Sequence, residues 1–330
     1  MITWGLVGNS HDASVAVFET KRKGLGPNET TRLLWAGLAK DFSGVPNDPH
    51  LNSEIIKHAL DYGRPDKLVW YERPLLKTLR QWRAGQGWLY SENNIRRYLD
   101  IRGLRGISLR YTQHHESHAA YAYYTQPHDD CAVICLDSIG EFETLTIWHG
   151  KNGKLKKIYS QGYPHSLGLF YSAMTQRIGL VPQRDEYLVA QYAARGNPER
   201  LALTIFNELV GTLDTGPKIV LKENLHRGCM WWHPELTSEQ DMYDIAAATQ
   251  WMFEYCVTYL STWTLQQTHS PNLALAGGGA LNRQAVDRIR TMWDNVHVPH
   301  NPGDPGSCIG AVLAKTAQRI KLDKQWHKAV

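Results

Sequence analysis

The chain has 330 residues, of which 42% are hydrophobic and 21% charged, a composition that excludes a disordered or low-complexity chain. No apolar run approaches the roughly 20 residues of a membrane helix, and the opening MITWGLVGNSHDAS lacks the features of a signal peptide. We therefore expect a cytoplasmic protein, whether cellular or viral within its host, without membrane contact. Five cysteines with no CxxC pair argue against a disulfide framework or a thiolate zinc site.

The first predicted element is a β-hairpin. Residues 2–19 read as an apolar strand, a Gly/Asn/Ser turn and an alternating strand, and a polar turn in KRKGLGPNETTR leads to a third strand. Residues 53–63, SEIIKHALDYG, then have the periodicity of a helix.

A basic and aromatic segment follows, from Arg73 to Arg110. It holds nine basic and two acidic residues, so its net charge is +7, and the total of +4 leaves −3 for the rest of the chain. Trp82 and Trp88 lie among these cations, a mixture typical of nucleic-acid channels. A solvated helix face or an acidic protein partner would explain the same pattern.

Two histidines, His114 and His118, come next, in QHHESHAAYA. On a helix, residues four apart lie on one face, so both imidazoles can reach one ion. Asp137 ends the apolar run CAVICLD, where a carboxylate at the end of a strand could complete a metal site. Ordinary surface or core histidines share this spacing, so the pair alone leaves both interpretations open.

Residues 131–161 repeat the opening pattern of strand, small polar turn, strand, turn and strand. Two such hairpins indicate a duplicated fold with a ligand between its halves. Helical periodicity dominates the later chain, in 166–180, 198–213 and 241–269. A short strand then runs into three glycines at 277–279, and a Gly/Pro-rich loop precedes the last helix.

Eight blocks of this sequence, in order, resemble the O-carbamoyltransferases of the nodulation-factor and antibiotic-tailoring type. The blocks are GLVGNSHDASVAV, WYERPLLK, QHHESHAAYAYY, LDSIGEFET, YPHSLGLFYSAMTQRIGL, DIAAATQ, LAGGGALN and NPGDPGSCIGAVL. The resemblance implies the α/β fold of the actin and sugar-kinase superfamily, shared with tRNA threonylcarbamoyl transferases. Its two lobes, each a mixed sheet flanked by helices, would span residues 1–128 and 129–330 with a ligand cleft between them.

The resemblance also implies a set of site residues. His114, His118, Asp137 and Asp304 would bind a divalent ion, iron first, with manganese or zinc also suited to these ligands. His11 and Asp12 would take the acceptor's proton, and Lys40 falls where the family has a basic residue near the donor. Contacts to ATP or carbamoyladenylate would come from Ser138, Gly140 and Glu141 at the phosphates, and from Gly277, Gly278, Gly279 and Asn282 at the adenosine.

The chain departs from the family pattern in two ways. We expect no C-terminal YrdC-type domain, the part that makes carbamoyladenylate from carbamoyl phosphate and ATP. In addition, EYLVAQYAARG places Leu188 and Gln191 where relatives have a lysine and a glycine. Either a separate protein supplies carbamoyladenylate, or carbamoyl phosphate reacts directly.

For the acceptor, the basic and aromatic segment favours nucleic acid. The hydroxymethyl group of a modified pyrimidine, 5-hydroxymethylcytosine in DNA or its nucleotide, offers the primary alcohol that carbamoyl transfer requires. Alternatives are a sugar or antibiotic-like acceptor, a tRNA threonylcarbamoyl transferase-like enzyme, and a catalytically silent nucleotide-binding subunit.

Overall fold

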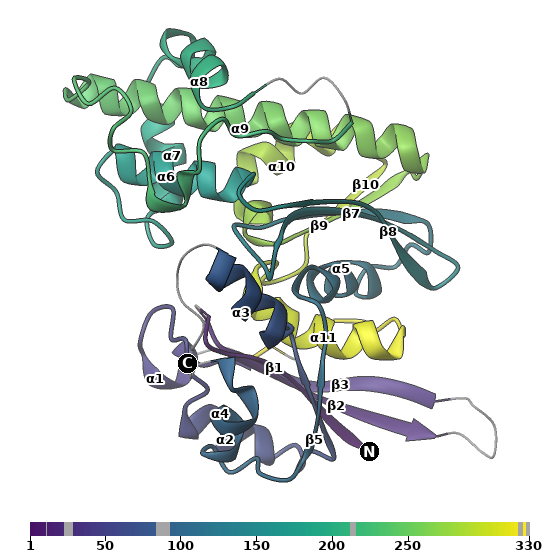
Figure 1. The fold of residues 1–330 in the computed structure, drawn as a ribbon. Coiled ribbons are helices and arrows are strands. Elements are labelled where there is room, and N and C mark those ends of the chain that lie inside the picture. Colours follow the sequence, from purple (N-terminus) through teal and green to yellow (C-terminus); the bar gives the residue numbers. More distant parts are fainter. Residues whose placement is uncertain (11, 23–28, 84–92, 212–215, 323–325, 328–330) are drawn as a thin grey trace.

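The computed structural model describes residues 1–10, 12–22, 29–83, 93–211, 216–322 and 326–327. Within these residues the chain forms two five-stranded mixed sheets, one in each of two stacked lobes (Figure 1). No helix among the described residues is long and apolar enough to cross a membrane.

The first sheet has the strand order β3-β2-β1-β4-β5. Its strands are β1 (Ile2–Val7), β2 (Ser14–Arg22), β3 (Glu29–Leu38), β4 (Lys67–Trp70) and β5 (Ser108–Tyr111). Strand β1 pairs antiparallel with β2 and parallel with β4, and β2 pairs antiparallel with β3. The predicted opening hairpin is therefore confirmed, whereas most of the turn predicted before β3 lies outside the described residues.

The second sheet repeats this order as β8-β7-β6-β9-β10. Its strands are β6 (Cys131–Leu136), β7 (Glu143–Lys151), β8 (Lys154–Gly162), β9 (Asn272–Ala276) and β10 (Asn295–His297). Each sheet consists of an antiparallel three-stranded meander followed by two parallel strands. This identity of order confirms the predicted duplication of the fold.

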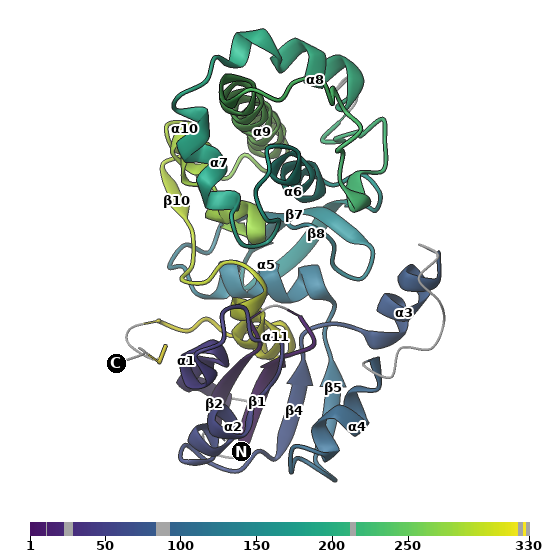
Figure 2. The ribbon, with the colours of Figure 1, turned by 90° about the vertical axis from the view of Figure 1, so that its left-hand side faces the viewer.

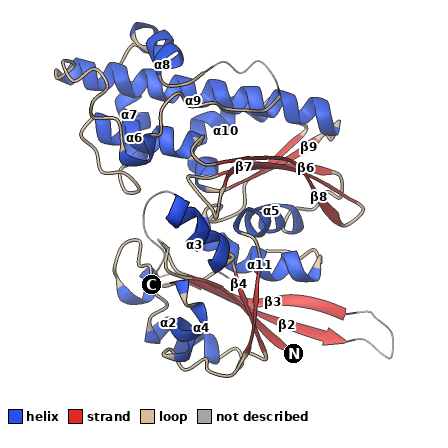
Figure 3. Ribbon diagram, in the orientation of Figure 1, coloured by secondary structure: helices blue, strands red, loops and turns tan. Residues whose placement is uncertain are grey.

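Two helices lie between the sheets, α5 (His114–Tyr124) and α11 (Ser307–Thr316), as Figure 3 shows. Helix α5 follows the first sheet in the chain but packs on β6, β7 and β9 of the second, whereas α11 follows the second sheet and packs on β1, β2 and β4 of the first. The two helices also pack against each other. The last helix of each predicted lobe thus packs on the sheet of the other lobe. Each sheet itself lies entirely on one side of the predicted lobe boundary between residues 128 and 129.

Strand β6 shows how the two cores are separated. Its alternate residues Cys131, Val133 and Cys135 join the core around α5 and α11, and Ala132, Ile134 and Leu136 join the core of the second lobe. A strand buried on both faces reads as the continuous apolar run seen in the sequence.

The remaining helices lie outside the space between the two sheets (Figure 2). In the first lobe these are α1 (Lys40–Ser43), α2 (Ser53–Leu60), α3 (Pro74–Arg83) and α4 (Ile95–Asp100). In the second they are α6 (Leu167–Arg177), α7 (Glu186–Ala193), α8 (Ala202–Glu208), α9 (Glu239–Thr268) and α10 (Arg283–Arg290). A capping box of Ser238 and Asp241 begins the 30-residue α9, which ends at the left-handed residue His269.

Candidate metal centre and active site

Four side chains with ligand atoms meet at the junction of the lobes. His114 and His118 lie one turn apart at the start of α5, Asp137 directly follows β6, and Asp304 begins the 3₁₀ turn η5 (Asp304–Gly306) before α11. One ligand atom from each residue lies within 4.8 Å of the others. The structure thus brings together the four residues that the sequence singled out, and we call them the candidate metal centre.

The distances within this centre suit a metal ion. His114 Nε2 lies 3.0 Å from His118 Nε2, 3.0 Å from Asp137 Oδ2 and 3.3 Å from Asp304 Oδ1. Bonds of about 2.1 Å place neighbouring ligand atoms about 3.0 Å apart around an octahedral ion and about 3.4 Å apart around a tetrahedral one. The side chains therefore need little movement to share one ion.

The charges of the four side chains also favour a bound cation. The imidazoles of His114 and His118 and the carboxylate of Asp304 are buried. Burial opposes a charge on His114, but Asp304 and Asp137 outweigh it and raise the pKa of His114 well above its usual value. The buried carboxylate of Asp304 and the half-buried one of Asp137 thus demand positive charge, which a divalent cation supplies as well as protons do.

Two serines orient the ligands from outside. Ser307 Oγ lies 3.3 Å from His118 Nδ1, and an Nδ1–H donated to it leaves the Nε2 lone pair directed at the centre. Ser10 Oγ donates to Asp304 Oδ2 over 2.6 Å, which leaves Oδ1 facing the imidazoles. Neither serine was predicted; their only sequence signal is that they lie in the NSHDAS and NPGDPGS motifs.

Glu141 holds the start of α5 rather than facing a ligand. The backbone N–H of His114 lies 3.0 Å from both carboxylate oxygens of Glu141, and the N–H of Arg73 donates to Oε1 over 2.8 Å. Amides at a helix N-terminus have no intrahelical acceptor, so a buried carboxylate there satisfies them. The phosphate contact that the resemblance implies for Glu141 stays a prediction.

The NSHDAS turn packs against the loop that carries Asp304. Besides the Ser10 contact, Ser14 Oγ donates to the carbonyl of Pro305 over 2.7 Å. Asp12 has a left-handed backbone (φ 58°), and Lys40 Nζ lies 3.3 Å from its Oδ1. Asp12 and Lys40, which were predicted separately, therefore form an ion pair beside this turn; His11 lies outside the described residues.

The glycine turn after β9 approaches the metal centre through its backbone. The N–H of Gly278 lies 3.4 Å from Asp137 Oδ1. Gly277 has a left-handed backbone (φ 84°), and a side chain there would overlap the carbonyl of Leu136. The exposed Gly278 thus presents its backbone beside a predicted metal ligand, while Gly279 packs against Leu136.

The turn after β6 is tied to the start of α6. Ser166 Oγ donates to the carbonyl of Ser138 over 2.7 Å and accepts from the N–H of Leu169, which caps α6. Gly168 packs directly against Ser138, and Gly140 lies against the ring of His114. Ser138 and Gly140 therefore flank the metal centre, as a phosphate-binding turn would require.

Asn282 caps α10 and belongs to a polar network in the second lobe. Its amide exchanges two hydrogen bonds with the amide of Gln250, at 2.9 and 3.0 Å, and its Oδ1 accepts from the N–H of Ala285. Tyr171 donates to Gln250 over 2.9 Å.

The two departures from the family pattern lie on α7. Leu188 is half-buried there and Gln191 is exposed.

The structure divides the basic and aromatic segment. Arg96 and Arg102 donate to backbone carbonyls, and Lys77 pairs with Glu72, so these cations serve the fold. Trp82 is 45% exposed, whereas Trp88 lies outside the described residues. Of the tryptophan pair near η3 (Leu225–Arg227), Trp231 is exposed and Trp232 is in the core.

Comparison with known proteins gives a match to one family model, described as carbamoyltransferase N-terminus, over residues 71–313. An uncharacterized protein of Synechocystis sp. is 32% identical over 240 residues, which cover 67% of this chain and 38% of that protein. The nodulation protein NolO of Bradyrhizobium diazoefficiens is 26% identical over 211 residues, which cover 62% of this chain and 38% of NolO. The chain thus matches less than half the length of these relatives.

Among solved structures, component A of (R)-2-hydroxyglutaryl-CoA dehydratase from Acidaminococcus fermentans is similar, with a TM-score of 0.50 and 12% identity. The match covers 96% of this chain and 99% of that one. At this identity the likeness concerns the fold alone, and it agrees with the duplicated architecture.

Proposed function

Because the chain belongs to the carbamoyltransferase family through its carbamoyltransferase N-terminal region, we propose that it transfers a carbamoyl group to an acceptor hydroxyl. The observation that carries this proposal is the convergence of His114, His118, Asp137 and Asp304 beside two phosphate-sized turns. A buried set of two imidazoles and two carboxylates suits iron, manganese or zinc. We propose iron first, following the family resemblance.

The reaction joins the acceptor oxygen to the carbamoyl carbon, while the bond from that carbon to the donor's phosphate oxygen breaks. The phosphate or adenylate leaves with the bonding electrons, and the acceptor's proton passes to His11 and Asp12. Lys40, paired with Asp12 over 3.3 Å, orients that carboxylate. A bound divalent ion supplies Lewis-acid polarisation and charge neutralisation at the donor.

The donor is proposed to be carbamoyl phosphate, used directly or as carbamoyladenylate made by a separate protein. The backbone is half-buried at Ser138 and exposed at Gly278, both beside Asp137, which suits contacts to phosphate oxygens, whereas Gly140 is buried against the ring of His114. For a nucleotide donor, Gly277, Gly279 and Asn282 would line the adenosine side.

For the acceptor we propose the hydroxymethyl group of 5-hydroxymethylcytosine, in DNA or as its nucleotide. The excess of cations and aromatic rings between Arg73 and Arg110 supports a phosphate-bearing acceptor over a neutral sugar.

Mass spectrometry of acceptors tests this function. The purified protein is incubated with carbamoyl phosphate and Fe²⁺, Mn²⁺ or Zn²⁺, with and without ATP, and with hydroxymethylcytosine DNA, its nucleotide or a sugar. A carbamoyl mass increment on the DNA or nucleotide supports the proposal. An increment confined to the sugar rejects the proposed acceptor, and no increment on any acceptor rejects carbamoyl transfer by this chain.

A further inference from the structure

Helix α3 presents an apolar stripe to solvent. None of its ten residues is buried. Leu75 is 85% exposed, Leu79 44% and Trp82 45%, and their spacing of four and three residues puts them on one face. Figures 1 and 2 both place α3 beside the first lobe at the level where the two lobes meet. Large apolar side chains exposed together mark a binding surface more often than isolated ones do.

The same helix is cationic. Its sequence, PLLKTLRQWR, contains three basic and no acidic residues, and the exposed Arg73 precedes it. Lys77 is paired with Glu72, and the basic residues Arg80 and Arg83 lie toward the end of the helix. The surface therefore combines flat or apolar groups with guanidinium groups.

The second lobe adds cations to this surface. Burial lowers the pKa of His226 in η3, and the nearby charges of Arg80 and Arg227 lower it further. Arg80 of the first lobe and Arg227 of the second therefore both lie close to one imidazole. Positive charge from both lobes gathers at this junction, with the exposed Trp231 four residues after Arg227.

The start of helix α3 is also linked to the metal centre through the carboxylate of Glu141. The N–H of Arg73, just before α3, and the N–H of His114 share the carboxylate of Glu141. The far part of the helix is held by Asn93, whose amide donates to Thr78 and Gln81 over 2.8 and 2.7 Å. A ligand bound along α3 would therefore extend toward His114.

Building on the proposed function, we propose that α3 and η3 together form the docking surface for a nucleic-acid strand that carries the acceptor base. Arg73, Arg80, Arg83 and Arg227 contact phosphates, and the Leu75, Leu79 and Trp82 stripe receives unstacked bases. Charge complementarity selects this occupant: a second copy of the chain docked through the same face would oppose like charges.

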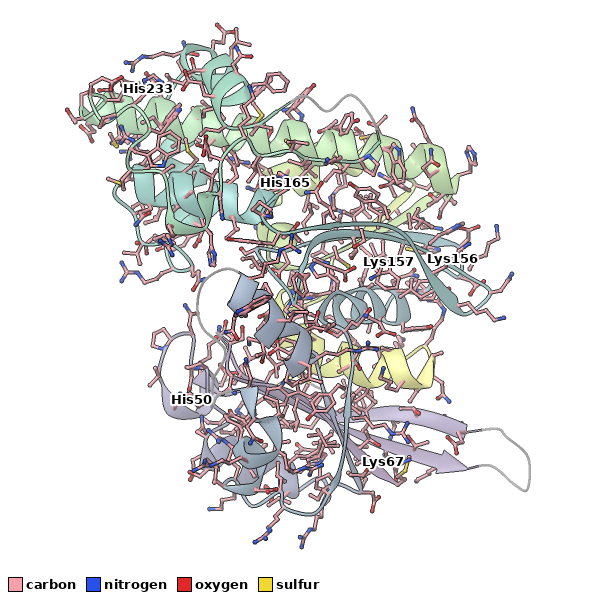
Figure 4. All side chains as sticks on the ribbon, in the orientation of Figure 1. His50, Lys67, Lys156, Lys157, His165 and His233 are labelled. Carbon is pink, nitrogen blue, oxygen red and sulfur yellow. The ribbon has the colours of Figure 1, made fainter. Side chains whose placement is uncertain are left out.

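Fluorescence anisotropy with labelled, unmodified single-stranded and duplex oligonucleotides tests this surface independently of the reaction. We expect Arg80→Ser/Arg83→Ser and Trp82→Ala each to weaken single-strand binding about tenfold or more, and the arginine pair to reduce the salt dependence by about two charges. The matched control is Lys154→Ser/Lys156→Ser, which removes two exposed cations from β8, away from α3 (Figure 4).

Equal weakening by the control pair, no binding by the wild type, or α3 variants that bind as well as wild type would each overturn the proposal. So would sedimentation showing that the α3 changes dissociate a dimer without affecting oligonucleotide binding. Unfolding midpoints matching the wild type confirm that the variants fold. Carbamoylation of the free hydroxymethylated nucleotide by the wild type separates the two hypotheses. If it occurs while the α3 variants bind oligonucleotides as well as wild type, only the docking surface is rejected, whereas its absence from the wild type counts against the proposed function.

Discussion

At the scale of single residues, the candidate metal centre depends on buried polar groups that are oriented before any ion arrives. Ser10 occupies one oxygen of Asp304, and Ser307 faces the outer nitrogen of His118. Asp304 and His118 thus each present one defined atom to the centre, which limits the rearrangement that binding requires.

The first prediction concerns a ligand itself. Asp304→Asn should abolish stoichiometric binding of Fe²⁺, Mn²⁺ or Zn²⁺, because an amide lacks the negative charge that offsets the buried cation. Elemental analysis of dialysed protein gives the metal content. The exposed Asp287→Asn is the control and should keep the wild-type metal content. Wild-type metal content in Asp304→Asn would exclude Asp304 as a ligand.

The second prediction concerns an outer contact. Ser307→Ala should weaken metal binding by about 10- to 100-fold, since His118 loses the group that fixes its tautomer and ring orientation. Competition with a chromogenic chelator measures the affinity, and thermal unfolding without metal should show little change. An unaltered affinity would assign Ser307 to packing alone.

Three ligands could be predicted from motifs with a chemical meaning, namely a histidine pair at helical spacing and an aspartate at the end of a strand. The fourth, Asp304, was implied by the family resemblance. The contacts of Ser10, Ser307 and Glu141 around these ligands could not be predicted. The sequence places Glu141 in a predicted phosphate-binding turn. In the structure its carboxylate accepts hydrogen bonds from amides at the start of α5, which have no acceptor within the helix. Only the tertiary position of that helix reveals this contact.

At the scale of elements, the crossing of α5 and α11 positions the metal centre. Gly310 on α11 lies so close to α5 that a side chain would overlap the carbonyl of Ser117, and one at Gly306 would overlap the ring of Tyr121. Close contact here brings Asp304, just before α11, next to His114 and His118 on α5.

The third prediction follows from this crossing. Gly310→Ala should lower the free energy of unfolding by about 1–3 kcal/mol or more, because the added methyl forces the helices apart. Urea unfolding measures the loss, and metal affinity should fall with it as Asp304 moves. The exposed Lys315→Ala on the same helix should change stability by less than about 0.5 kcal/mol. Equal stability of Gly310→Ala and wild type would contradict the close packing.

The fourth prediction concerns pH and the loop before α9. His233 lies between Glu235 and Glu208, with Nδ1–Oε1 2.8 Å and Nε2–Oε2 3.1 Å (Figure 4). Its pKa is raised, mainly by the hydrogen bond to Glu235 and despite partial burial. A raised folded-state pKa stabilises the protein below the unfolded value of about 6.5, and this contribution disappears as pH rises through the folded value.

We therefore expect His233→Asn to unfold at a lower temperature than wild type at acidic pH, with the difference shrinking at alkaline pH. Asparagine suits the left-handed backbone there (φ 46°). The exposed His269, also left-handed (φ 49°), provides the control His269→Asn, which makes the same substitution at a second left-handed position. A difference for His233→Asn that is constant across pH would refute the ion pairs.

Most elements near the metal centre could be predicted because they are strongly periodic or follow clear turns. Helix α3 could not, since nothing in the described chain buries its residues and its apolar and basic positions mix. Short strands such as β4 and β10 also escaped prediction, because three or four residues carry too little pattern.

At the scale of the whole molecule, duplication was readable from two similar hairpins, and the matching sheet orders confirm it. The packing of α5 and α11 on the sheet of the opposite lobe could not be predicted, because the sequence pattern of an apolar helix does not say which sheet it packs on. That packing explains why the metal ligands come from both halves of the chain: Asp304 precedes the helix that returns to the first sheet.

The central claim is that this chain transfers a carbamoyl group at its four-residue metal centre. The most direct test is mass spectrometry of hydroxymethylcytosine DNA and its nucleotide after incubation with carbamoyl phosphate and Fe²⁺, with and without ATP, comparing wild type with Asp304→Asn. We predict a carbamoyl increment with wild type that falls to background in Asp304→Asn. No increment with wild type, or equal increments from both proteins, would contradict the account.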